Sequence, residues 1–128
     1  LGAGQVVKIM NNMVLFQTVL ALSEAVTIAE RSGVDGKILL ETMSKGSGDS
    51  FALRNHGMKS ILPEDYPEKA FSVRYALKDL SYALEIAKEN GISASGAANV
   101  KEKFEQAIAA GDGDRYFPVI RRLLNAND

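Results

Sequence analysis

Apolar residues recur every three or four positions along most of this chain, a spacing that predicts helices. The β-branched residues fall inside these helical patterns and do not alternate with polar ones, so no strand is expected. The first helix should run from about Gln5 to Arg31 or Ser32, with Gly33 as the residue that ends it.

This first helix is unusually apolar. From Met13 to Ala29 its only charged side chain is Glu24. Polar groups inside the run and the lack of a basic cluster beside it argue against a membrane span. A soluble helix that is apolar nearly all round is instead expected to be buried by its neighbours.

Five further helices are expected, separated by Gly-rich or Pro-rich turns. Their approximate bounds are Asp35 to Gly46, Phe51 to Met58, Ser72 to Asn90, Ser95 to Ala110, and a last helix that Asp114 caps and that carries Pro118 in its first turn. The pattern therefore predicts an all-α fold, with about six helices packed around one long, largely buried N-terminal helix.

Composition bounds the class of protein. The chain has 128 residues, 46% of them hydrophobic and 24% charged, which is typical of a single soluble domain. There is no Cys, which excludes disulfide scaffolds and thiol chemistry and fits a cytoplasmic location. The net charge of -1 gives no general attraction for nucleic acid or an anionic membrane. Because the chain starts without Met and enters a helix at once, it is expected to be part of a longer protein.

Polar residues gather at the start of the first helix. Spacings of three and four residues place Gln5, Lys8 and Asn12 on one stripe. Lys8 lies near the positive end of the helix, and partial burial there would favour its neutral amine, the form that can accept a proton. Gly2 and Gly4 would let backbone or ligand approach closely. The alternative from spacing alone is that Lys8 is simply solvated.

Other polar residues are interpreted as ordinary structure. His56, the only His, is expected at the surface or in a local hydrogen bond, and it cannot make a metal site alone. The Gly46–Ser50 segment is expected to be a plain turn. The Asp112–Asp114 segment is expected to be a turn and cap, since it lacks the further ligands of a calcium loop. Arg121 and Arg122 are expected at a solvated helix end. No metal site is predicted.

Two segments resemble the β-hydroxyacid dehydrogenase family, which includes 3-hydroxyisobutyrate dehydrogenase and 2-hydroxy-3-oxopropionate reductase. The segment Gly2–Asn12 is similar to the motif that opens the family's long helix, and Phe71–Leu84 is similar to its "F…KDL…AL" helix. The stop at Gly91 and the turn before the last helix also fit, so the resemblance covers the whole chain. It implies that residues 1–128 are the helical C-terminal domain of a two-domain enzyme whose N-terminal Rossmann domain is absent from this chain.

The resemblance also implies roles for individual residues. Lys8 would be the catalytic acid/base that exchanges a proton with the substrate oxygen, and Asn12 and Gly4 would bind the substrate. On the second helix, Lys78 and Phe71 would contact the cofactor.

Asp79 is a further candidate near the cofactor and would help to set the site. The implied cofactor is NAD or NADP, bound mainly by the missing domain. Without the family resemblance, Lys78 and Asp79 would be interpreted as part of a solvated helix face. Tyr75 and Tyr82, however, lie on the same stripe as Lys78.

Two related families are disfavoured. In 6-phosphogluconate dehydrogenase a His stands where this chain has Asn11, and imine reductases usually replace the Lys at position 8. The implied substrate is a small hydroxy acid, and the implied assembly is a homodimer or homotetramer. The isolated chain is expected to be inactive. The alternative hypothesis is a non-catalytic helical association module.

Overall fold

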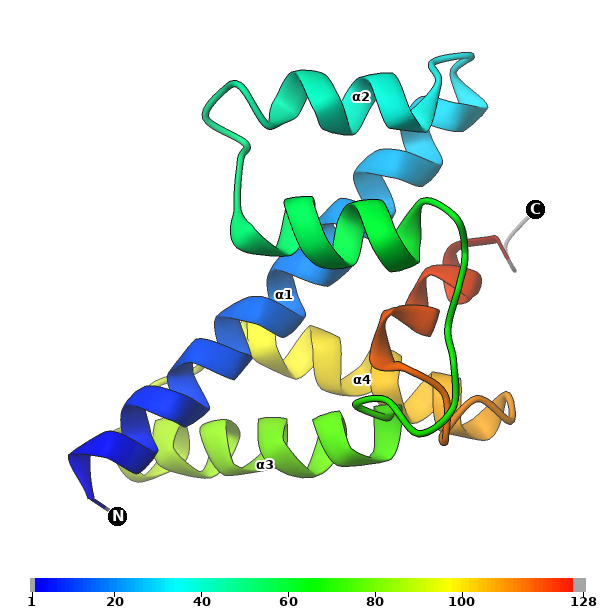
Figure 1. The fold of residues 1–128 in the computed structure, drawn as a ribbon. Helices are drawn as coiled ribbons and strands as arrows, with labels where there is room; N and C mark the ends of the chain where they lie inside the picture. The colour runs from blue at the N-terminus through cyan, green and yellow to red at the C-terminus, as the bar shows by residue number, and fades with distance from the viewer. Residues whose placement is uncertain (1, 126–128) are drawn as a thin grey trace.

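A computed structural model describes residues 2–125 and confirms the all-α fold (Figure 1). No strand occurs among these residues, and one of the helices is a π-helix and another a 3₁₀ helix. In chain order the elements are α1 (Ala3–Arg31), α2 (Gly36–Met43), the π-helix η1 (Leu53–Ile61), α3 (Val73–Glu89), α4 (Ser95–Ala109) and the 3₁₀ helix η2 (Phe117–Asn125).

The long helix α1 is the axis of the domain, and it contacts every other helical element. Its C-terminal half packs against α2 and η1, while α3 and α4 lie beside its N-terminal half (Figure 1). The helix η2 contacts α1, α3, α4 and η1 and so joins the two groups. The predicted arrangement around the first helix is therefore confirmed.

Aromatic rings form the centre of the core. Phe16, at the middle of α1, is fully buried. Its ring meets Phe117, Phe104 and Phe71 edge to face at centroid distances of 5.0, 5.5 and 5.8 Å. This geometry suits the quadrupoles of the rings. One residue thus ties α1 to α4, η2 and the segment before α3.

The bounds of most helices follow local signals. Gly33 has φ of 90°, a conformation that favours glycine, and it ends α1 as predicted. The carboxylate of Asp35 accepts a hydrogen bond from the Ile38 amide at 3.2 Å and caps α2. Ser72 caps α3 in the same way, accepting from the Tyr75 amide at 3.2 Å.

The third helical segment is longer than predicted. It continues past Met58 to Ile61, and it is wound as a π-helix. The reason is tertiary, because Ile61 is completely buried and fixes the end of the segment in the core. At Gly57 an added Cβ would lie 3.4 Å from the Leu40 side chain, an ordinary contact distance, so this segment packs directly against α2.

The predicted cap at Asp114 is wrong. The last helix begins at Phe117, and the Asp114 carboxylate instead accepts a hydrogen bond from Arg74 at 3.2 Å. Residues before η2 pair with the segment before α3 through two isolated antiparallel bridges, Glu68 with Arg115 and Ser72 with Tyr116. These bridges use the backbone groups that an earlier helix start would have needed.

The prediction of a solvated end at Arg121 and Arg122 is also wrong for Arg121, which is only 5% exposed. Its guanidinium donates to the Ile61 carbonyl at 2.6 Å and makes a salt bridge with Glu30. Arg122 remains exposed, with its guanidinium 5.5 Å from the Tyr66 ring centroid. Arg121 therefore fastens η2 to the ends of α1 and η1.

The cover over α1 is not complete. Val7, Val14, Ala21 and Ile28 recur at seven-residue intervals and are all exposed. The helix is also long and apolar enough to cross a membrane by length and composition. A core helix of a soluble protein passes the same test, and residues Phe16 to Thr27 supply buried side chains to this core.

Replacing Arg121 with Met should destabilise the domain by about 2 kcal/mol, because the Ile61 carbonyl and Glu30 lose a charged donor. Urea denaturation followed by circular dichroism measures this change. The matched control is Lys45→Met, on an exposed side chain, which should stay within about 0.5 kcal/mol of the wild type. Equal midpoints for both variants would contradict the role of Arg121.

Candidate active site

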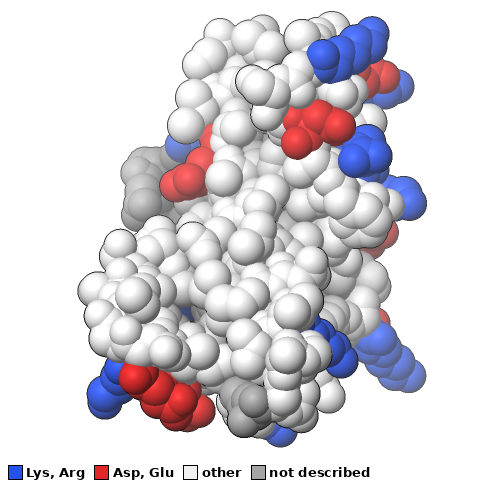
Figure 2. Space-filling model, turned by 90° about the vertical axis from the view of Figure 1, so that its left-hand side faces the viewer, with Lys and Arg blue, Asp and Glu red and all other residues white. Residues whose placement is uncertain are grey.

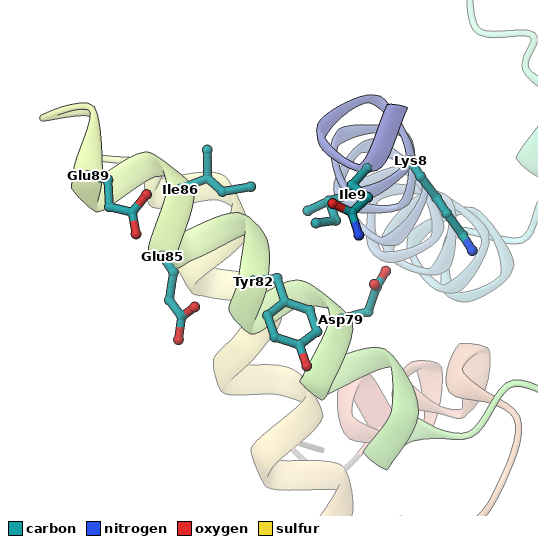
Figure 3. A pocket seen from close by; sticks show the side chains of 8 residues that line it. Lys8, Ile9, Asp79, Tyr82, Glu85, Ile86 and Glu89 are labelled. Carbon is teal, nitrogen blue, oxygen red and sulfur yellow. The ribbon is translucent and has the colours of Figure 1, made fainter. Parts of the chain in front are cut away.

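An open groove runs between the start of α1 and the outer face of α3 (Figure 3). It has a volume of about 650 Å³, and helix α3 supplies most of its wall. Its lining residues are Gln5, Lys8, Ile9, Asp79, Tyr82, Glu85, Ile86 and Glu89. Ile9 on α1 lies across the gap from Asp79 and Tyr82 on α3, while the side chain of Lys8 extends along the side of α1, away from Tyr82 (Figure 3).

A smaller cavity of about 260 Å³ adjoins this groove. Its lining residues are Lys8, Tyr75, Lys78, Asp79 and Tyr82. We call it the Lys8–Lys78 cavity. It brings together three of the residues singled out in the sequence, namely Lys8, Lys78 and Asp79. Two ammonium groups and one carboxylate give it a net positive charge, which suits an anionic ligand.

A hydrogen bond joins the two walls of the site. The Asn12 amide nitrogen on α1 donates to the Asp79 carboxylate on α3 at 2.8 Å, and this contact is partly buried. Asp79 thereby fixes the orientation of the Asn12 amide, whose oxygen accepts from the Asn11 amide nitrogen at 3.4 Å and keeps a second lone pair for a ligand. It also ties the stripe of Lys8 to the helix that carries Lys78.

Three predicted residues lie outside the lining of these cavities, namely Asn12, which Asp79 holds, Phe71 and Gly4. Phe71 is 37% exposed and belongs to the aromatic cluster around Phe16, but its ring is 5.6 Å from that of Tyr75, which lines the Lys8–Lys78 cavity. Gly4 is exposed in the first turn of α1, and an added Cβ would meet nothing within 4 Å. The space beside Gly4 is therefore open, and its role beside the substrate stays a prediction.

The side chain of Lys8 is exposed. The sequence argument expected its amine to be partly buried, and residues 2–125 do not provide that burial. They do place Lys8 in the lining of both spaces, together with Asp79 and Tyr82. The arrangement can bind an anion and exchange a proton with it.

The Lys8–Lys78 cavity fits one end of a dinucleotide. Its cations, Tyr75 and the nearby Phe71 ring offer charge and flat surfaces for a ring and its ribose. The described residues lack the strand, Gly-rich loop and helix that bind the pyrophosphate in a Rossmann domain. These residues therefore fit part of such a cofactor and not the whole.

The sequence analysis placed Tyr82 on the stripe of Lys78 but missed Glu85 and Glu89, which continue this wall of the groove. Tyr82, Glu85 and Glu89 follow Lys78 at helical spacings of four, three and four residues, so they continue its stripe along α3. That signal was available. The partnership of Asn12 with Asp79 was not, because 67 residues separate them and no local pattern relates them.

His56 lies in a separate cavity of about 400 Å³ between η1 and the segment before η2. Its ring stacks on Tyr116 at 6.0 Å and packs against Phe117 at 5.6 Å. Its Nδ1 atom is buried and has no hydrogen-bond partner. The expectation of a surface or locally hydrogen-bonded His is therefore wrong, because aromatic packing holds the ring. Within residues 2–125 no three side chains gather as a candidate metal site.

With this geometry established, comparison with known proteins defines the class. Residues 2–124 match the family described as the NAD-binding domain of NADP-dependent 3-hydroxyisobutyrate dehydrogenase. The chain belongs to this family, which confirms the resemblance seen in the sequence and the association of the fold with a nicotinamide cofactor.

Individual relatives support the same class of protein. The chain is 32% identical to an uncharacterized oxidoreductase of Shewanella frigidimarina, covering 90% of this chain and 38% of the relative. It is 30% identical to glyoxylate/succinic semialdehyde reductase 1 of Arabidopsis thaliana, covering 93% and 40%. The structure of Mycobacterium tuberculosis 3-hydroxyisobutyrate dehydrogenase with L-serine superposes with a TM-score of 0.87 at 27% identity, covering 98% of this chain and 44% of that one. The chain thus spans about two fifths of the curated relatives.

The burial of His56 lowers its pKa below the usual 6.5, because the cavity disfavours the charged ring. Between the lowered pKa and 6.5 the unfolded chain binds a proton that the folded chain does not. The free energy of unfolding should therefore fall as the pH drops from 6.5 through that window. An NMR titration of the only His should give a midpoint below 6.5.

His56→Leu is the control, because it should remove this part of the pH dependence of stability. A His56 midpoint at or above 6.5 would contradict the prediction.

Proposed function

We propose that this chain is the substrate-binding and catalytic domain of an NAD(P)-dependent 3-hydroxyacid dehydrogenase. Its substrate would be a small acid such as 3-hydroxyisobutyrate or 2-hydroxy-3-oxopropionate. The observation that carries the proposal is the Lys8–Lys78 cavity, where Lys8, Lys78 and Asp79 meet and Asn12 is held by Asp79. Family membership supports the same class of reaction.

Lys8 is the proposed general acid/base. When the acid is oxidised, its amine would take the proton of the substrate hydroxyl, and in the reverse direction it would return that proton to the carbonyl oxygen. Asn12 would bind the substrate through the amide oxygen that Asp79 leaves unused. Gly4, at the exposed start of α1, would allow the substrate or a neighbouring backbone to come near.

The cofactor side of the site is proposed for α3. Lys78 would contact the nicotinamide half of the cofactor by charge and hydrogen bonding, and Phe71 would supply an apolar edge beside it. Asp79 would act through Asn12 and Lys8, setting their positions. When bound, the nicotinamide supplies or accepts the hydride.

The rest of the enzyme is proposed to include an N-terminal Rossmann domain that binds most of the cofactor. Such a domain would also select NAD or NADP and complete the substrate pocket. The proposed location of the protein is the cytoplasm.

A second candidate function is association between subunits. Val7, Val14, Ala21 and Ile28 form an exposed apolar stripe with a seven-residue repeat on α1, the spacing by which helices pair. The face shown in Figure 2 also carries few charged side chains at its centre. This stripe favours a homodimer or homotetramer, alongside catalysis or in place of it.

Replacing Lys8 with Ala in the full-length protein should lower turnover of 3-hydroxyisobutyrate by roughly a hundredfold to ten-thousandfold, because the proton transfer loses its acid/base. Lys8→Arg should be equally impaired, since a guanidinium keeps the charge but does not give up its proton. Initial rates of nicotinamide reduction measure both.

Lys37→Ala, on an exposed side chain of α2, is the matched control and should keep normal turnover. Near-normal turnover in Lys8→Ala would rule out the catalytic assignment.

Replacing Val14 with Glu should shift the protein toward monomers, because it places a charge in the exposed stripe of α1. Sedimentation velocity over a range of concentrations measures the distribution of species. Ile38→Glu is the control, on an equally exposed apolar side chain of α2, and should leave the distribution unchanged. A protein that is monomeric at every concentration would remove the support for association.

A further inference from the structure

Tyr82 stands between the two spaces of the candidate site. Lys8, Asp79 and Tyr82 line both the Lys8–Lys78 cavity and the larger groove. Along α3, Tyr82 lies between Asp79, which also lines both spaces, and Glu85, which lines the groove alone (Figure 3). Tyr82 is 43% exposed.

Beyond Tyr82 the groove is lined by apolar side chains and then by carboxylates. Ile9 and Ile86 give it partly buried apolar walls, and the exposed carboxylates of Glu85 and Glu89 stand at its far end. The groove has about 650 Å³, compared with about 260 Å³ for the Lys8–Lys78 cavity. There is thus room past Tyr82 for several carbon atoms, in surroundings that suit an apolar chain and oppose a second anion.

We infer that Tyr82 determines substrate length, by closing the Lys8–Lys78 cavity against the groove so that only short hydroxy acids are accepted. Tyr82 acts here through its ring, as a wall, and takes no part in the proton transfer. The inference rests on the proposed function, because it assumes that the substrate reacts beside Lys8.

Removal of the ring should join the two spaces. A substrate held at Lys8 could then extend its tail between Ile9 and Ile86, where burial of added methylene groups strengthens binding. A tail that ends in a carboxylate would instead meet Glu85 and Glu89. The structure therefore implies both a length limit and a charge preference beyond it.

The experiment compares kcat/KM of the full-length enzyme for 3-hydroxybutyrate, 3-hydroxyheptanoate and 3-hydroxyheptanedioate. In Tyr82→Ala, the ratio for heptanoate over butyrate should rise about tenfold, a typical gain when a pocket accepts extra methylenes. The dicarboxylate should gain much less. The double change Glu85→Gln with Glu89→Gln, added to Tyr82→Ala, should bring the dicarboxylate up toward the heptanoate.

Two variants serve as controls. Tyr82→Phe keeps the ring and should keep the wild-type length preference. Tyr75→Ala removes a more exposed ring, at 68%, that lines the small cavity but not the groove, so it should not shift the preference toward long acids. Thermal melting confirms that each variant is folded, and Tyr82→Leu replaces Tyr82→Ala if the latter is not.

The outcomes separate the two proposals. An unchanged length preference in Tyr82→Ala, in an enzyme that still depends on Lys8, overturns the inference and leaves the function intact. So does a change confined to the KM of the nicotinamide cofactor, because it would place Tyr82 against the cofactor. Turnover that survives Lys8→Ala overturns the proposed function itself.

Discussion

The packing of α1 is the constraint on which the rest of the domain depends. All of its fully buried side chains lie between Phe16 and Thr27, and every other helical element contacts this helix. The turns before Phe16 therefore extend beyond the densest part of the core, with α3 and α4 beside them (Figure 1). Gln5, Lys8 and Asn12 occupy that extension. The site is polar and open to solvent because this part of α1 lies beyond the buried core.

The hydrogen bond between Asn12 and Asp79 makes this extension a site. Without it, the polar start of α1 and the stripe of Lys78 on α3 would be two solvated helix faces. With it, an amide on one helix and a carboxylate on the other are held at 2.8 Å, and Lys8 and Lys78 share one cavity. A partly buried contact of this kind restricts side chains that would otherwise lose entropy on binding a ligand.

Local signals made much of the fold predictable. The φ values of Gly33, Gly91 and Gly111 are positive, and each glycine follows a helix whose end was predicted within a residue or two. The failures have tertiary causes. Arg121 looks like a solvated residue beside Arg122, yet Glu30 and the Ile61 carbonyl, distant in sequence, hold it in the interior.

The site shows the same contrast between local signals, which are predictable, and tertiary contacts, which are not. Helical spacing placed Lys8 with Asn12, and the family resemblance added Lys78, but nothing local indicated which residue of α3 would meet Asn12.

The exposure of Lys8 connects the chemistry with the shape of the domain. An amine that exchanges protons near neutral pH works best when water is kept away and a hydride donor lies within contact distance. Residues 2–125 place Lys8 at the edge of the site but leave it open to solvent. On the proposed function, the Rossmann domain that binds the nicotinamide cofactor would also cover Lys8. Binding of the cofactor would then exclude water from the Lys8 amine. That cover would close the Lys8–Lys78 cavity from above, while the boundary along α3 would still belong to this chain. The length of substrate is then decided by Tyr82, whichever domain supplies the lid.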